Sequence, residues 1–141
     1  MNNWYKDLTK FSTKSTPPNY SDIYIDPNTG DVYYYNDRNQ ISRLDGPAIE
    51  WSDGYKAWCI DGKLHRTDGP AIEYSNGSKF WFINGKLHRI DGPAIEYSDG
   101  SKVWYVDGKF IGNSTNGFTD KDFEEYKKRN NIISSLRFAE K

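Results

Sequence analysis

Leu44-Asp-Gly-Pro-Ala-Ile-Glu-Trp-Ser-Asp-Gly54 returns as Thr67-Asp-Gly-Pro-Ala-Ile-Glu-Tyr-Ser-Asn-Gly77 and again as Ile90-Asp-Gly-Pro-Ala-Ile-Glu-Tyr-Ser-Asp-Gly100. The copies start 23 residues apart. The same period continues through Lys56, Lys79 and Lys102; through Trp58, Trp81 and Trp104; and through Gly62, Gly85 and Gly108. A fixed period of this length is typical of arrays in which each repeat is one structural unit stacked on its neighbours.

Asx-Gly pairs divide the array into short segments. Within the copies they are Asp45-Gly46, Asp53-Gly54, Asp61-Gly62, Asp68-Gly69, Asn76-Gly77, Asn84-Gly85, Asp91-Gly92, Asp99-Gly100 and Asp107-Gly108. Gly adopts positive φ freely and Asx tolerates it, so these pairs between aromatic and β-branched runs indicate hairpin turns. The segments between them have the length of short strands. We therefore predict a mainly β fold: an elongated antiparallel sheet of repeated β-hairpins with a C-terminal helical cap.

Composition divides the chain into three regions. We predict a flexible N-terminal arm at residues 1–20, the hairpin array at residues 21–112, and a linker with a C-terminal helix at residues 113–141. Residues 23–43 are interpreted as a degenerate first copy, since terminal repeats often depart from the consensus.

The C-terminal helix has its own start and stop signals. Thr119 is placed to cap it, acidic residues fill its first turn and basic residues follow. Phe123, Tyr126, Ile133 and Leu136 form a partial apolar stripe, whereas Asn130-Asn131 predicts a break. We expect the helix to cover the open edge of the last repeat, which would otherwise template aggregation.

Strand alternation assigns side chains to two faces. In the second strand of a copy, Trp58 and Ile60 share one face, and Ala57 and Cys59 share the other. We expect the positions that keep Ile or Trp in every copy, such as Ile49 and Trp58, to form the interior, and the variable positions to form the surface.

The same reasoning ranks two tryptophans. Trp81 lies in a repeat with full copies on both sides, whereas Trp104 has only the helix beyond it. We therefore expect Trp81→Ala to cost more stability than Trp104→Ala.

Composition excludes several classes of protein. A chain of 141 residues forms one domain, and its 19 basic residues nearly balance its 20 acidic ones, so it lacks the basic excess of nucleic-acid binders. The single cysteine forms no internal disulfide, and no apolar run has the length of a membrane span or a signal peptide. We expect a cytoplasmic protein with no membrane partner.

A repeated His-Arg pair is the strongest candidate for a binding surface. Stacked copies would align these side chains into a stripe that grips a phosphate or an acidic partner, flanked by variable aromatic residues. The candidate partner-binding residues are Arg43, Arg66, Arg89, His65, His88, Tyr55, Phe82 and Tyr105. The alternative, which we favour, is that each His-Arg pair bonds a neighbouring turn aspartate such as Asp68 or Asp91 and belongs to the architecture of the repeat.

Other periodic residues favour structural roles. Lysines and glutamates form two rows that would pair weakly across the hairpins: Lys56, Lys79 and Lys102 with Glu50, Glu73 and Glu96. The Asx-Gly turns lack the spacing of calcium loops, and two histidines and one cysteine at unrelated positions make a poor metal site. Cys59 replaces Phe82 and Tyr105 at its position, which favours packing. We predict no catalytic residues, no metal and no cofactor, and therefore no enzyme.

The unit Asp-Gly-Pro-Ala-Ile-Glu-Tyr-Ser-Asp-Gly-Ser-Lys-x-Trp-Tyr-x-Asp-Gly-Lys-Leu-His-Arg resembles the membrane occupation and recognition nexus (MORN) repeat in its short bacterial and phage variant. The resemblance covers about residues 23–112, although Arg66 and Arg89 stand where the standard repeat often has Gly. It implies an elongated twisted antiparallel sheet that serves as an interaction scaffold. Arrays that end in a short acidic helix are similar to proteins of tailed phages.

These observations lead to one expected function and two alternatives. We expect a non-catalytic module that binds another protein, and the resemblance implies a phage-encoded inhibitor or modulator of a host protein. A small-ligand or nucleotide sequestering protein would instead stack a base on aromatic rings and hold phosphate with the Arg/His stripe. The second alternative is a structural virion component. No sequence-specific nucleic acid is expected as a partner.

Overall fold

The computed structural model describes residues 23–132. The predicted N-terminal arm, residues 1–20, lies outside the described residues, as do Ile133 and Leu136 of the predicted helix stripe.

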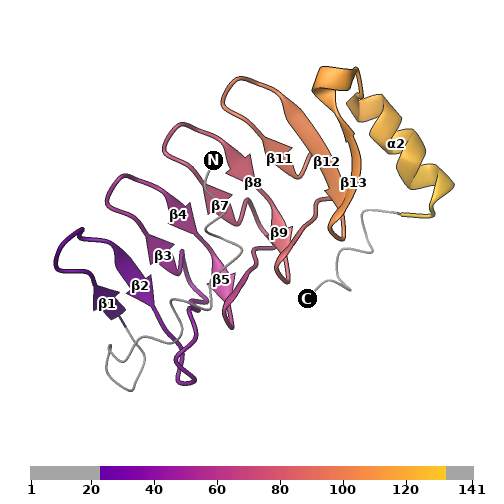
Figure 1. Ribbon diagram of the computed structural model, residues 1–141. Helices are drawn as coiled ribbons and strands as arrows, with labels where there is room; N and C mark the ends of the chain where they lie inside the picture. Colours follow the sequence, from indigo (N-terminus) through magenta and orange to yellow (C-terminus); the bar gives the residue numbers. More distant parts are fainter. Residues whose placement is uncertain (1–22, 133–141) are drawn as a thin grey trace.

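Within the described residues, the strands form a nine-stranded antiparallel sheet and two small two-stranded sheets. The large sheet has the order β1 (Ile23–Ile25), β2 (Val32–Tyr34), β3 (Ile49–Glu50), β4 (Lys56–Ala57), β7 (Ile72–Glu73), β8 (Lys79–Phe80), β11 (Ile95–Glu96), β12 (Lys102–Val106) and β13 (Lys109–Asn113). The small sheets pair β5 (Cys59–Ile60) with β6 (Lys63–Leu64) and β9 (Phe82–Ile83) with β10 (Lys86–Leu87). Successive hairpins therefore lie side by side along the sheet (Figure 1), and the predicted fold class is confirmed.

Every full copy contributes the same hairpin. In the first, Ile49 of β3 pairs with Ala57 of β4, and the second joins Ile72 to Phe80 in the same register. The degenerate first copy also forms a hairpin, β1 with β2, as predicted. Chain neighbours are thus also sheet neighbours, which lets the array grow by one hairpin per repeat.

Tight turns close the small sheets at the predicted Asx-Gly pairs. Asp61 has φ of 50° and Gly62 has φ of 80°, between the paired residues Ile60 and Lys63. Two consecutive residues at positive φ are the mark of a type I′ turn, whose twist matches that of the strands it joins. Asn84-Gly85 and Asp107-Gly108 repeat these angles, so the turn chemistry is a property of the repeat.

The core lies on the sheet face that carries the variable positions of the second strand. Ile49 faces the same way as its partner Ala57, because side chains of paired residues share a face. Ala57 and Cys59 have no exposed surface, whereas Trp58 and Ile60 are only half-buried on the opposite face. The expectation that the Ile and Trp positions together form the interior is therefore wrong for Trp58. Which face of the second strand is buried depends on its pairing with Ile49, and the alternation of side chains within one strand does not reveal that pairing.

The core is rich in aromatic and small residues. Its buried members are Tyr33, Tyr35, Ile41, Ala48, Ile49, Ala57, Cys59, Leu64, Ala71, Ile72, Tyr74, Phe80, Phe82 and Ile95. Neighbouring rings meet edge to face, as Tyr74 and Phe80 do with centroids 5.2 Å apart, an arrangement that aromatic pairs prefer. Large rings on adjacent strands thus cover one another.

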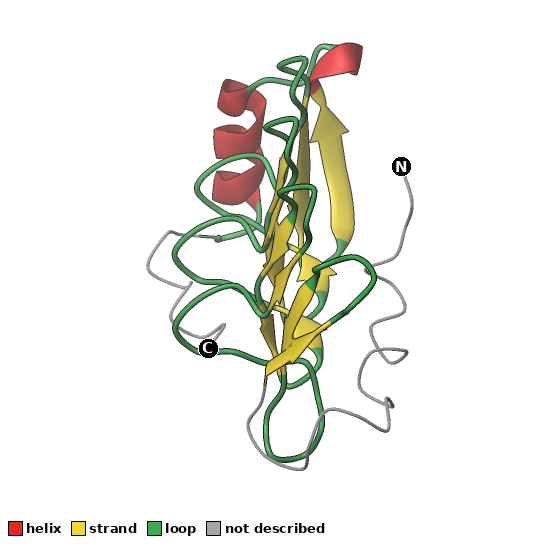
Figure 2. Ribbon diagram, turned by 90° about the vertical axis from the view of Figure 1, so that its left-hand side faces the viewer, coloured by secondary structure: helices red, strands yellow, loops and turns green. Residues whose placement is uncertain are grey.

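The C-terminal segment closes the last hairpin. A short 3₁₀ helix, η2 (Ser114–Asn116), leads into α2 (Asp120–Arg129). Thr119 caps α2 in a capping box with Asp122, and the helix ends before Asn130, so both predicted signals are confirmed. Phe123 is buried with its ring centroid 6.4 Å from that of Trp104. The helix therefore packs on a face of the last hairpin (Figure 2), whereas the sequence predicted that it would cover the open edge.

This packing reverses the expected ranking of the tryptophans. Trp104 is 1% exposed beneath Phe118 and Phe123, whereas Trp81 is half-buried. We predict that Trp104→Ala costs about 3–5 kcal/mol in urea denaturation and that Trp81→Ala costs less. Trp104→Phe serves as the control and should lose less, since the indole N–H of Trp104 has no hydrogen-bond partner among the described residues. A larger loss for Trp81→Ala would contradict this packing argument.

Cys59 provides a chemical test of the core. Its thiol is fully buried, and burial raises its pKa to about 12. Only the thiolate is nucleophilic, so at pH 8 the native protein should react with a disulfide reagent such as DTNB orders of magnitude more slowly than the urea-unfolded protein. Rapid stoichiometric labelling of the native chain would place the thiol at the surface.

Candidate functional site

The degenerate first copy and the first two full copies are each followed by a loop that is organised by one arginine. We call these arginine loops, and they comprise residues 43–47, 66–70 and 89–93. The guanidinium of Arg66 lies over the ring of Trp58, with its Cζ 3.8 Å from the ring centroid. It donates from Nε to Asp68 Oδ1 at 2.9 Å, and from Nη1 to the carbonyl of Pro70 at 3.0 Å and to Glu73 Oε2 at 2.8 Å. One side chain thus links a tryptophan, a loop and the next strand.

This cluster explains the order Asp-Gly-Pro in the repeat. Asp68 supplies the carboxylate, and the carbonyl of Pro70 supplies a second acceptor. A Cβ atom on Gly69 would lie 2.9 Å from Cζ of Arg66, closer than ordinary contacts allow. Any side chain at this position would therefore displace the guanidinium, which lies against the backbone of Gly69.

The other two arginine loops repeat the arrangement. Arg89 lies over Trp81 at 3.9 Å and donates to Asp91, Pro93 and Glu96. Arg43 lies over Tyr34 at 4.0 Å and donates to Asp45 and Pro47. The hydrogen bond from Arg43 holds the pKa of the Asp45 carboxyl below its usual range.

The histidines join consecutive repeats. Nδ1 of His65 accepts the backbone N–H of Asn84 at 3.0 Å, and Nδ1 of His88 accepts that of Asp107 at 2.9 Å. Ser42 performs the same task in the first copy, where its Oγ accepts the N–H of Asp61. In each case the donor is the first residue of an Asx-Gly turn, so this position fastens one turn to the previous repeat.

The favoured alternative for the His-Arg pairs is therefore the one that the contacts support. Arg66 and Arg89 bond Asp68 and Asp91 as expected. The histidine contacts differ in part from the expected bonds to turn aspartates, because His65 accepts a hydrogen bond from the backbone N–H of Asn84 in the following turn.

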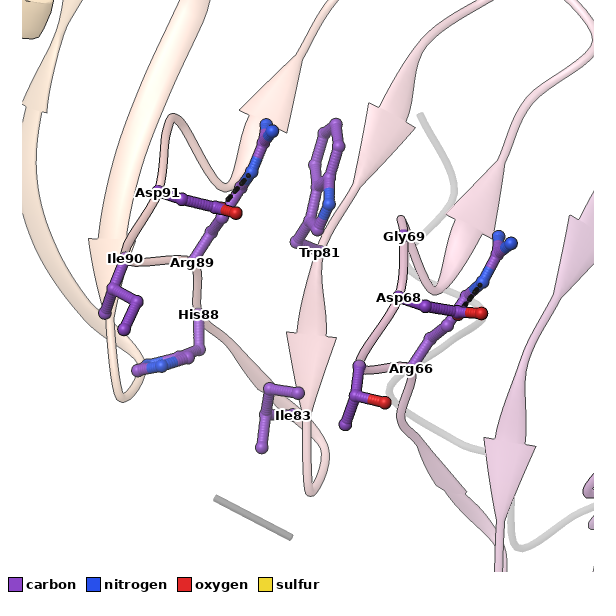
Figure 3. A pocket seen from close by; sticks show the side chains of 10 residues that line it. Arg66, Asp68, Gly69, Trp81, Ile83, His88, Arg89, Ile90 and Asp91 are labelled. Carbon is purple, nitrogen blue, oxygen red and sulfur yellow. Dashed lines mark hydrogen bonds and ion pairs between the residues drawn. The ribbon is translucent and has the colours of Figure 1, made fainter. Parts of the chain in front are cut away.

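Two grooves separate the arginine loops on this face of the sheet. The first groove, about 560 Å³, has walls at residues 43–46 and 65–68 and a floor of Trp58 and Ile60. The second groove, about 320 Å³, has walls at residues 66–69 and 88–91 and a floor of Trp81 and Ile83. In Figure 3 Trp81 lies between Arg89 on one side and the loop of Arg66, Asp68 and Gly69 on the other. The repeat thus presents the same apolar floor and polar walls twice.

The eight candidate partner-binding residues do not gather into one surface. Arg43, Arg66, Arg89, His65 and His88 lie on the groove face, although His88 is 5% exposed. Phe82 is buried in the core, and Tyr55 and Tyr105 pack against that core on the opposite face. The aromatic rings that line the grooves belong to Trp58 and Trp81.

Sequence reasoning missed Leu44, Thr67, Ile60 and Ile83 as groove residues. Leu44 is 91% exposed, and Thr67 is exposed at the same position of the next copy. Two signals were available: this position varies between copies directly after the arginine, and alternation places each isoleucine on the face of its tryptophan.

The lysine and glutamate rows oppose each other in the sheet but the glutamates bond arginine. Glu73 is in register with Lys79 and Lys56, and its carboxylate pairs with Arg66. Glu96 pairs in the same way with Arg89. The predicted cross-strand neighbours are therefore correct, whereas the ion pairs involve a residue from the arginine loop.

Comparison of the chain with protein-family models, curated proteins and solved structures gives no match. Across residues 23–132, no three His, Cys, Asp or Glu side chains gather to hold a metal ion. The same part of the chain contains no helix of the length and apolar character that crossing a membrane requires.

Charge reversal of two loop arginines tests their architectural role. In Arg66→Glu/Arg89→Glu, four acidic side chains lose their partner and face a like charge, so we expect the melting temperature to fall by about 10 °C or more. The matched control is Arg38→Glu/Arg129→Glu, which changes exposed arginines and should shift melting only slightly. A double variant that melts normally would contradict the architectural role.

Proposed function

We propose that this chain is a non-catalytic protein-binding module and that it binds its partner through the two grooves between the arginine loops. The observation that carries the proposal is the repetition of one concave site, with a Trp-Ile floor, on the same face. Concave sites with an apolar floor and a few polar groups are where proteins bind ligands, and Trp and Arg are enriched in the residues that dominate interface energies.

The rims of the grooves add to this argument. Leu44 is 91% exposed at the edge of the first groove, where it extends the apolar surface of the Trp58 and Ile60 floor. The side chains of Asp45 and Asp68 are 86% and 83% exposed. An apolar floor with a polar rim is the usual anatomy of a protein interface.

The contacts of the arginines do not favour a phosphate ligand. Each of Arg66 and Arg89 already donates to two carboxylates and a carbonyl and stacks on a tryptophan. A phosphate would have to displace these acceptors, and the carboxylates beside it would repel it. We therefore place protein binding ahead of nucleotide sequestration. On the sequence resemblance alone, the partner would be a bacterial host protein that the chain inhibits or modulates.

Capture from a bacterial lysate with matched surface variants tests the proposal. Leu44→Lys/Thr67→Lys adds two long side chains at the groove rims. Ile25→Lys/Thr29→Lys makes the same chemical changes at exposed positions in the first hairpin, outside both grooves. We expect the wild-type chain and the control to capture the same protein in similar amounts. The groove variant should capture at least ten-fold less of it.

Both variants should melt within a few degrees of the wild type, since the changes are at exposed positions. Equal capture by all three chains would move the interface away from the grooves. A thermal shift with a nucleotide panel, which we expect to be negative, would favour the sequestering alternative if it were positive.

A further inference from the structure

The third full repeat has no arginine loop after it, and other side chains cover its tryptophan. By the repeat period, the counterpart of Trp58 and Trp81 is Trp104, and the counterpart of Arg66 and Arg89 is Gly112. In place of a guanidinium, Phe118 packs against the indole, with ring centroids 5.2 Å apart and ring planes tilted by 60°. A Cβ atom on Gly112 would overlap this phenyl ring, so Phe118 takes the space that an arginine side chain would need.

Helix α2 covers the floor and wall of this third position. The ring of Phe123 packs beside Trp104, and the preceding arginine loop is covered as well: Ile90 is 4% exposed, whereas Leu44 at the same repeat position is 91% exposed. One helical segment therefore converts the open surface of a repeat into a buried one.

A buried lysine fixes α2 to the arginine loop. Lys127 is 7% exposed, and its ammonium donates to the backbone carbonyl of Ile90 at 2.8 Å and pairs with Glu124 at 2.8 Å. The carbonyl that it meets belongs to the residue directly after the loop arginine. Leu44 and Thr67 have this place in the other two loops and line the grooves.

We infer that α2 is an internal copy of the partner's binding element, and that the two grooves accept an amphipathic helix of another protein that presents an aromatic residue and a lysine one turn apart. The aromatic ring would lie beside Trp58 or Trp81, next to the stacked arginine, as Phe123 lies beside Trp104. The lysine would donate to the carbonyl of Leu44 or Thr67. This inference rests on the proposed function and specifies its partner.

Charge and shape agree with this occupant. Arg43 faces Asp45 and Glu50, and Arg66 faces Asp68 and Glu73, so each of these clusters holds two carboxylates against one guanidinium. This net negative charge at the groove walls attracts a cationic side chain and repels an acidic one. Helices that dock into grooves place their anchors at i, i+3, i+4 and i+7, and Phe123 and Lys127 are four residues apart on α2.

A peptide with the sequence of residues 117–132 serves as the probe for the full-length chain. We expect saturable binding, measured by isothermal titration calorimetry, with up to two peptides per chain. Phe123→Ala or Lys127→Met in the peptide should weaken binding at least ten-fold. The control peptide Lys128→Met alters an exposed lysine and should bind within about two-fold of the parent.

Variants of the protein assign the site. Leu44→Lys/Thr67→Lys should weaken peptide binding at least ten-fold, and Ile25→Lys/Thr29→Lys should leave it unchanged. If the peptide binds the groove variant as tightly as the wild type, it displaces α2 from Trp104, and the inference is overturned. Failure of the peptide to bind would overturn it as well.

Two further outcomes separate this inference from the function on which it rests. If the peptide does not bind but lysate capture still depends on Leu44 and Thr67, the protein-binding function stands and the helical occupant is wrong. If the chain self-associates in sedimentation and both Leu44→Lys/Thr67→Lys and the full-length variant Lys127→Met abolish it, the occupant is a second copy of this chain, and the assignment to a foreign partner is overturned.

Discussion

The contact between a loop arginine and the tryptophan beneath it is the interaction on which the array depends. Strands of two residues bury little surface, so a short hairpin alone does not stabilise the loop that follows it. The guanidinium solves this by stacking on the ring and donating to the loop and to the next strand at once, as Arg66 does with Trp58, Pro70 and Glu73. A planar group with several fixed donors is suited to this task, and lysine is not.

The hairpins and their order followed from local chemistry. Asx-Gly turns depend only on the residues that form them, so Asp61-Gly62 predicted its turn without knowledge of the rest of the chain. The N-cap at Thr119 is local in the same sense. Strand order followed from the period, since identical units stack in sequence order.

The features that sequence reasoning missed all depend on contacts between distant residues. Which face of the second strand is buried depends on the pairing of Ala57 with Ile49 and Ile72, and both faces carry apolar side chains. The sequence predicts that Glu73 pairs with a lysine, because Lys79 lies opposite it in the sheet. Its carboxylate instead pairs with Arg66, which reaches it from the loop. The burial of Trp104 depends on Phe118 and Phe123, and the approach of Phe118 is permitted by the absence of a side chain at Gly112.

The bonds between repeats have a consequence for how the chain folds. His65 reaches Asn84 and His88 reaches Asp107, each across 19 residues, so closing any joint of the array requires a loop of the same modest length and nearly the same entropy. None of these contacts between consecutive repeats requires the two ends of the chain to come together. Folding should therefore start at any neighbouring pair of hairpins and spread in both directions, at the speed that a low contact order allows. Within the described residues, the end that α2 covers would be the last to fray.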